Sequence, residues 1–140
     1  MNRMDADLRD GIYALETQRI IGCAFAVINA VGHGFHEKPY EAALAVDFRH
    51  HGISFVQQAH FPLYYRDVQI GEYIPDLIAF GKVIVETKTI GAITDHEIGQ
   101  MMNYLRVTGL QVGLILNFKH SKLQFRRVTL TPPSAPLLNS

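Results

Sequence analysis

Two charged residues lie in the most apolar stretch of the sequence. Val83-Ile84-Val85 is a β-branched run typical of a strand buried on both faces, and Glu86 and Lys88 follow it closely. At two-residue spacing, the two charges project from the same face of that strand. Burying charge without a partner is costly, so these residues need a reason to be there. Two interpretations are open: an ion pair at an exposed strand end, or a metal-binding carboxylate beside an ammonium that handles a water or phosphate oxygen.

Asp76 favours the second interpretation. It follows Pro75 and precedes an apolar segment, and Gly81-Lys82 then predicts a tight turn into the strand that carries Glu86. The segments on either side of this turn would be antiparallel neighbours, with Asp76 beside Glu86 or Lys88. Two converging carboxylates repel each other unless a cation lies between them, and hard oxygen ligands suit Mg²⁺ or Mn²⁺.

Hydrophobic periodicity predicts an α/β (α+β) domain built round a mixed sheet, in the order α-α-β-β-β-α-β-β. Residues 7–31 have helical spacing, with Thr17 as a candidate internal cap, and the spacing of Thr94 and Glu97 predicts a capping box. The expected elements are helices over 7–31, 37–51 and 94–108, strands over 54–65 and 68–73, segments 75–80 and 83–88 joined by the turn, and strands over 112–117 and 122–128.

Composition narrows the function classes. The 140 residues predict one domain over 1–140, with 1–10 and 129–140 as flexible ends, and 48% hydrophobic residues exclude a disordered chain. Thirteen basic residues balance thirteen acidic ones, so a purely electrostatic nucleic-acid binder is not expected. The single cysteine, Cys23, excludes an internal disulfide and a multi-cysteine zinc site, and it is expected to be a small core residue. Residues 20–31 are too short a stretch to span a membrane, so we expect a cytoplasmic protein.

The motifs resemble a known family. Pro75-Asp76, nine intervening residues and Glu86-Thr87-Lys88 are similar to the signature of the PD-(D/E)xK nuclease superfamily. Residues 34–40, GFHEKPY, resemble the pattern that names the GxxExxY protein family, a branch of that superfamily. The likeness runs from about residue 17 to residue 128 and includes Gln100 and Tyr104, which resemble the QxxxY element of helicase-associated nucleases.

This resemblance implies a restriction-endonuclease-like core, a mixed sheet flanked by helices with a metal site at one end. It assigns the metal to Asp76, Glu86, Glu37 and a backbone carbonyl near Thr87. Lys88 would position or activate the attacking water. Gln100 and Tyr104 would support the lysine and contact substrate, and their spacing of four places both on one helical face.

The expected function is therefore a nuclease that uses Mg²⁺ or Mn²⁺, with DNA rather than RNA as substrate and with a homodimer as one arrangement. The alternative is a catalytically inactive module of the same fold that binds nucleic acid or a protein. Several residues also have structural interpretations. Glu37 could serve the helix dipole, Tyr40 is expected in the core, and Tyr104 could be a packing residue. Four basic residues could form a phosphate-binding edge or solvated surface: Lys119, Lys122, Arg126 and Arg127.

Overall fold

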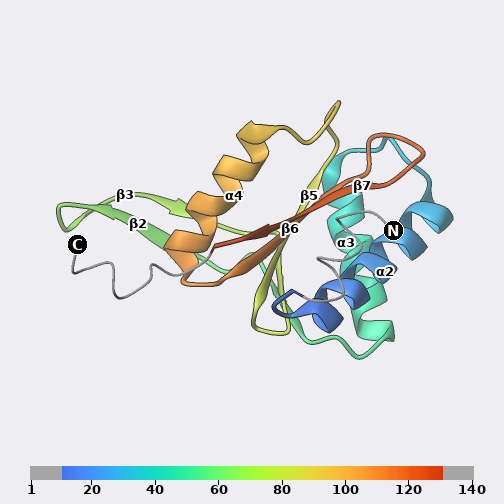
Figure 1. The fold of residues 1–140 in the computed structure, drawn as a ribbon, viewed down its shortest axis with the longest axis horizontal. Helices are drawn as coiled ribbons and strands as arrows, with labels where there is room; N and C mark the ends of the chain where they lie inside the picture. The colour runs from blue at the N-terminus through green and yellow to red at the C-terminus, as the bar shows by residue number, and fades with distance from the viewer. Residues whose placement is uncertain (1–10, 131–140) are drawn as a thin grey trace.

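A five-stranded mixed sheet organises the chain in the computed structural model, which describes residues 11–130 (Figure 1). The strand order is β1-β4-β5-β6-β7, and β2 and β3 form a separate two-stranded sheet. The elements are α2 (Ala14–Val31), α3 (Glu37–His50), β1 (Phe55–Gln57), β2 (Phe61–Tyr65), β3 (Val68–Tyr73), β4 (Leu77–Ala79), β5 (Val83–Lys88), α4 (Asp95–Thr108), β6 (Val112–Asn117) and β7 (Gln124–Thr129). The predicted mixed sheet flanked by helices is confirmed.

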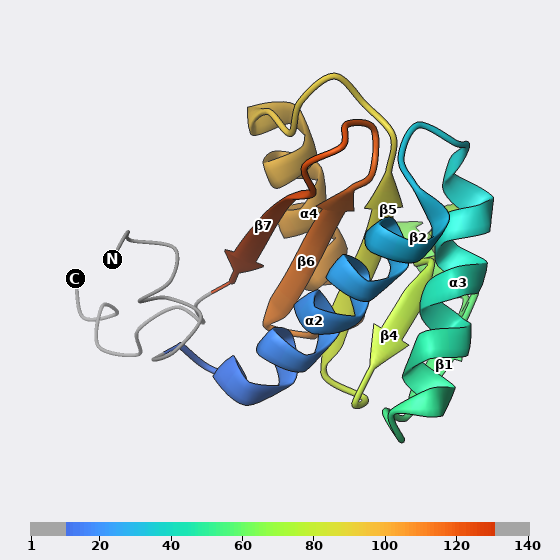
Figure 2. The same ribbon diagram turned by 90° about the vertical axis from the view of Figure 1, so that its right-hand side faces the viewer.

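Helices cover both faces of the sheet. Figure 2 shows α2 and α3 in front of β4, β5 and β6, with α4 behind them. Val83 and Val85 point into the core under α2 and α3, whereas Ile84 points into the core under α4. This alternation along β5 is why its apolar residues form a continuous run, as expected for a strand covered on both sides. Glu86 continues the Ile84 side of the strand.

The central strand, β5, has one antiparallel and one parallel neighbour. β4 pairs antiparallel with β5, as the turn at Gly81-Lys82 predicted, and the register sets Leu77 opposite Val85. β5 pairs parallel with β6, so the chain needs the crossover that α4 provides. Gly113 on β6 lies directly under Met101 of α4, where an added Cβ would overlap the Met101 sulfur.

The helix boundaries agree with the sequence prediction in part. The Thr94–Glu97 capping box is present, and α4 ends before Gly109, which has a positive φ of 77°. Thr17 is not a cap: it lies inside α2, is fully buried, and donates from Oγ1 to the carbonyl of Ala14. Leu15 is 73% exposed, and the buried face of α2 follows other positions. Those buried positions are Thr17, Ile20, Ile21, Cys23, Ala24, Val27 and Ile28.

The predicted strand over 54–65 is wrong as a single element. It divides into β1, which pairs with β4, and β2, which belongs to the other sheet. The break is at Gln58, which has a positive φ of 56°, and its amide donates to the carbonyl of Asp76. The alternation of apolar residues continues through the break, so periodicity alone could not locate it.

The β2–β3 hairpin extends away from the main sheet (Figure 1). The predicted turn is confirmed at Arg66 and Asp67, which both have positive φ, the conformation that a two-residue hairpin turn requires. Near the turn, Tyr64, Tyr65 and Val68 are exposed.

α2 is long and apolar enough to cross a membrane by length and composition alone. In this fold it packs over the sheet as a core helix, with Ile20 and Ala24 fully buried. At the other end, β7 begins at Gln124 rather than 122 and includes Thr129, which the sequence assigned to the flexible end. The expected flexibility of 1–10 and 131–140 lies outside the described residues.

Candidate functional site

β4 and β5 bring Asp76 and Glu86 together. Asp76 lies immediately before β4, and its amide donates to Glu86 Oε2 at 3.2 Å. Thr87, the residue after Glu86, donates to Asp76 Oδ2 from both its amide (2.8 Å) and its Oγ1 (2.9 Å). The two carboxylates are therefore fixed to each other's strand. The sequence prediction that Asp76 lies beside Glu86 is confirmed.

Only one oxygen of each carboxylate is committed. Oδ2 of Asp76 and Oε2 of Glu86 accept hydrogen bonds, whereas over residues 11–130 no hydrogen bond reaches Asp76 Oδ1 or Glu86 Oε1. Fixed carboxylates with uncommitted oxygens are the donor set that a hard divalent cation requires. The residues present therefore fit a divalent metal.

Burial raises the pKa values of both acids. Glu86 is 8% exposed, and burial first, then the negative charge of Asp76, raise the pKa of Glu86 from 4.5 to about 7. Burial also raises the pKa of Asp76, although the two hydrogen bonds from Thr87 oppose the rise. A carboxyl group with a pKa near neutrality, paired with a second acid, is typical of a functional site.

Tyr73 is a site residue that the sequence analysis missed. It ends β3, and its hydroxyl donates to Glu86 Oε2 at 2.7 Å. Burial, followed by the charge of Glu86, raises the pKa of this phenol, so Tyr73 acts as a neutral donor. Its position three residues before Asp76 is the only signal in the sequence, and that signal does not show that the end of β3 packs beside Ile84 of β5.

Tyr104 reaches the site through Tyr73. The two rings are stacked, with 3.7 Å between centroids and 10° between planes. Burial, then the charges of Glu86 and Asp76, raise the pKa of Tyr104. Gln100 lies one turn before it and lines an open cavity of about 610 Å³ along α4, together with His96, Asn103 and other residues of that helix. Within the described part of the chain, no hydrogen bond joins Gln100 to Asp76, Glu86 or Lys88.

The acid of α3 that acts on Asp76 is Glu41. The structure does not bring Glu37 to the Asp76–Glu86 pair. Glu37 is exposed in the first turn of α3. Glu41, one turn further on, is 5% exposed, and its negative charge helps to raise the pKa of Asp76. Gln57 and Gln58 donate to Glu41 Oε2 at 3.1 and 2.8 Å, and Lys38 approaches its Oε1 at 3.4 Å. Glu41 follows Tyr40 directly, but nothing in the spacing alone favoured it over Glu37.

Residues 34–40 form an anchor for the turn before α3. Tyr40 is fully buried, as predicted, and its ring stacks on Phe118 with 4.3 Å between centroids. Its hydroxyl donates to the carbonyl of Gly32 and accepts from the amide of Phe35. Gly34 has a φ of 87° and donates its amide to the carbonyl of Phe118. The motif therefore sets where α3 begins, and with it the position of Glu41.

Lys88 ends β5 two residues after Glu86 and is half-buried. Its positive charge lowers the pKa of Glu86, which opposes part of the effect of burial. Across the described residues, Lys88 Nζ lies within ion-pair distance of no carboxylate, so the structural ion-pair interpretation is not supported. Thr87 contributes its amide and hydroxyl to Asp76, and a metal-ligand role for its carbonyl stays a prediction.

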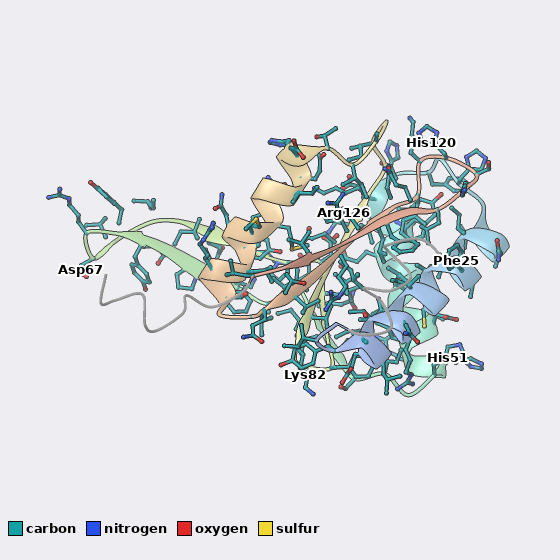
Figure 3. The ribbon with its side chains drawn as sticks, in the orientation of Figure 1. Phe25, His51, Asp67, Lys82, His120 and Arg126 are labelled. Carbon is teal, nitrogen blue, oxygen red and sulfur yellow. The ribbon has the colours of Figure 1, made fainter. Side chains whose placement is uncertain are left out.

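The four basic residues near the end of the chain do not share one edge. Arg126 and Arg127 are consecutive on β7 and point to opposite faces. Arg127 donates to the carbonyl of Ile12 at 2.6 Å and has a structural role. Lys119, Lys122 and Arg126 are exposed, and Figure 3 shows Arg126 on β7.

Comparison with known proteins gives the family. A model of the PD-(D/E)XK nuclease superfamily matches residues 14–128, which include every site residue described above. The chain belongs to the PD-(D/E)XK nuclease superfamily. Members of this superfamily generally hydrolyse phosphodiester bonds and use divalent metals. The match therefore indicates a nuclease-like function.

One solved structure, described as "Crystal structure of SSO0001", shares the fold. The TM-score is 0.54 at 12% sequence identity, and the alignment covers 91% of this chain. The chain spans 64% of the length of that protein. This likeness shows the fold alone. Among curated proteins, none matches the sequence.

Proposed function

We propose that this chain is a metal-dependent nuclease that hydrolyses phosphodiester bonds of DNA with Mg²⁺ or Mn²⁺. The observation that carries the proposal is the Asp76–Glu86 pair: a half-buried and a buried acid, each held through one oxygen and uncommitted at the other. A divalent cation bound there would neutralise the charge of the scissile phosphate and lower the pKa of the attacking water.

The chain's own residues have separate tasks in this proposal. Asp76 and Glu86 hold the cation, and Thr87 and Tyr73 keep the two carboxylates oriented for it. Glu41 takes the place expected for Glu37 as the acid from α3, and acts through its charge beside Asp76. Lys88, which forms no ion pair among the described residues, aligns the attacking water and offsets negative charge on the transition state.

The residues of α4 are the basis for the proposed substrate contacts, and the number of sites in one copy is the basis for the proposed oligomeric state. In this proposal Gln100, which lines the open cavity along α4, and Tyr104, whose ring stacks on Tyr73, contact the nucleic acid. Residues 11–130 of one copy carry one such carboxylate pair, and cutting both strands of a duplex needs two, which supports a homodimer on duplex DNA.

We also assign the chain to the GxxExxY branch, because Gly34 and Tyr40 fix the start of α3. The free thiol of Cys23 suits the cytoplasm.

The test is cleavage by the full chain. Plasmid, single-stranded DNA and single-stranded RNA are incubated with Mg²⁺, Mn²⁺ or EDTA, using the parent, Asp76→Asn and the control Asp67→Asn, which lies exposed at the hairpin tip. We expect cleavage of DNA with either metal, loss in EDTA and in Asp76→Asn, and full activity in Asp67→Asn. Metal and DNA binding without cleavage of any substrate would instead identify a catalytically inactive module, and equal activity in both variants would remove the carboxylate pair from the reaction.

A further inference from the structure

A second group of metal-ligating side chains lies at the far end of α3 from Glu41. It comprises Cys23 on α2, Asp47 on α3, and His51, the residue that follows α3. One potential ligand atom from each residue lies within 4.8 Å of the others. Asp47 Oδ2 is 3.5 Å from His51 Nε2, because residues four apart share a helical face. The ten residues from Glu41 to His51 correspond to about 15 Å of helix, so this group is separate from the Asp76–Glu86 pair.

The group contains a buried acceptor that lacks a partner. Asp47 Oδ2 has almost no contact with solvent, and within residues 11–130 nothing donates a hydrogen bond to it. Buried oxygen atoms of this kind are rare, and each calls for an explanation such as a bound ion. His51 Nε2 lies 3.5 Å from this oxygen without a hydrogen bond to it, and that separation suits two ligands of one cation.

The thiol faces the same carboxylate. Cys23 is 4% exposed, and burial first, then the neighbouring Asp47 carboxylate, raise the pKa of Cys23 to about 12. The nearby Arg19 acts in the opposite direction and favours the thiolate. Arg19 also donates to the carbonyl of His51 at 2.8 Å and so ties the end of α3 to α2.

A cavity gives access to the group. Its volume is about 430 Å³, and Cys23 and His51 line it together with Arg19, Gly22, Ala26 and Ile53. His51 itself is half-exposed, so an ion can enter from solvent. Figure 3 shows His51 at the opposite end of the molecule from Asp67 at the hairpin tip.

We propose that Cys23, Asp47 and His51 bind a divalent transition metal, with Zn²⁺ as the preferred ion. Sulfur, nitrogen and oxygen donors together suit Zn²⁺ and not Mg²⁺, and three protein ligands leave a fourth tetrahedral position open to the cavity. On binding, the bond between sulfur and hydrogen breaks, a sulfur–metal bond forms and one proton passes to solvent, with no change of oxidation state. The ion would cross-link α2 to the end of α3.

The experiment uses the full chain after treatment with EDTA. Co²⁺ is added as a spectroscopic substitute, and Zn²⁺ and Mg²⁺ are compared by thermal melting and by calorimetric titration. We expect a sulfur-to-cobalt charge-transfer band at one equivalent, and a rise in melting temperature with Zn²⁺. His51→Ala should weaken Zn²⁺ binding roughly tenfold or more. The adjacent His50→Ala should bind as the parent does.

Two further variants separate this site from the carboxylate pair. Cys23→Ser should abolish the charge-transfer band, and His51→Ala, at a more exposed position, provides the same test if that variant fails to fold. Glu86→Gln should keep the band and the Zn²⁺ affinity. Absence of a charge-transfer band in the parent, or equal Zn²⁺ affinity in the parent and His51→Ala, would overturn the proposal whatever the result of the nuclease assay.

Discussion

The ring of Tyr104 lies flat against the ring of Tyr73, and the Tyr73 hydroxyl donates to Glu86. Helix α4 thereby reaches a carboxylate that it does not touch through any hydrogen bond of its own in the described structure. The two tyrosines therefore have different roles. Tyr104 provides a ring for stacking, whereas Tyr73 provides both a stacked ring and a hydrogen-bond donor.

The two tyrosines form a matched pair for mutation. Tyr73→Phe keeps the stacked ring but removes the hydrogen bond that opposes the raised pKa of Glu86. We expect the pKa of Glu86 to rise further and divalent-metal affinity at pH 7 to fall roughly tenfold. The Tyr104 hydroxyl makes no hydrogen bond within residues 11–130, so Tyr104→Phe should keep the metal affinity of the parent. Calorimetric titration of Mn²⁺ makes the comparison, and equal losses in both variants would refute the role assigned to Tyr73.

The metal-free protein should become less stable as the pH rises through neutrality. The folded pKa of Glu86, about 7, exceeds its ordinary value of 4.5, so between these values the folded state binds more protons than the unfolded state. This contribution is fully present below pH 4.5 and is lost above pH 7, with a size on the order of 3 kcal/mol. Glu86→Gln should abolish this pH dependence and be at least as stable as the parent at pH 8, while cleavage is lost. Denaturant unfolding in EDTA at pH 5.5 and pH 8 measures this loss of stability. A parent protein that is more stable at pH 8 than at pH 5.5 would contradict the prediction.

Glu41 and Glu37 can be compared directly, because they lie one turn apart on the same helix. Glu41→Gln removes a charge that raises the pKa of Asp76, so Asp76 should ionise more readily in this variant. Because easier ionisation of Asp76 would favour metal binding, a loss of affinity in Glu41→Gln would come from Glu41 itself. We expect the metal affinity to fall roughly tenfold. Glu37→Gln, at an exposed position, should behave as the parent. Mn²⁺ titration and cleavage rates decide, and a loss confined to Glu37→Gln would restore the assignment made from the motif.

Lys88 should be needed for cleavage and not for metal binding. Lys88→Met keeps the length of the side chain and removes its charge, and we expect the cleavage rate to fall roughly 10²-fold or more with Mn²⁺ affinity nearly unchanged. The matched control is Lys122→Met, which removes an exposed charge that forms no ion pair in the described residues. If Lys88 served only stability, its removal would lower the melting temperature and leave the rate per folded molecule intact.

The sequence predicted the carboxylate pair because its geometry is local. Asp76 lies directly before β4 and Glu86 lies on β5, and a short turn joins these two strands. The alternation of side chains along β5 places Glu86 and Lys88 on the same face. The capping box of α4 and the buried Tyr40 were predictable for the same reason, since each depends on residues three or four positions apart.

The rest depends on contacts between distant segments. Tyr73 reaches Glu86 only because the last residue of the hairpin strand β3 packs beside β5, and the charge of Glu41 acts on Asp76 only because α3 packs against β5. The break at Gln58 depends on a hydrogen bond to residue 76, which a local pattern cannot contain. Cys23 has the burial that was expected of a core residue, but its neighbours Asp47 and His51 come from another helix.

The missing side chain at Gly113 sets how closely α4 can approach the sheet. Met101 occupies the space that any Cβ at this position would need, and Tyr104 follows Met101 by one turn of the same helix. Even a methyl group at 113 would force the Met101 side chain to adopt another conformation, although β6 contributes no side chain to the carboxylate pair. The packing of α4 against the sheet, one turn before Tyr104, therefore depends on the absence of a side chain on a different strand.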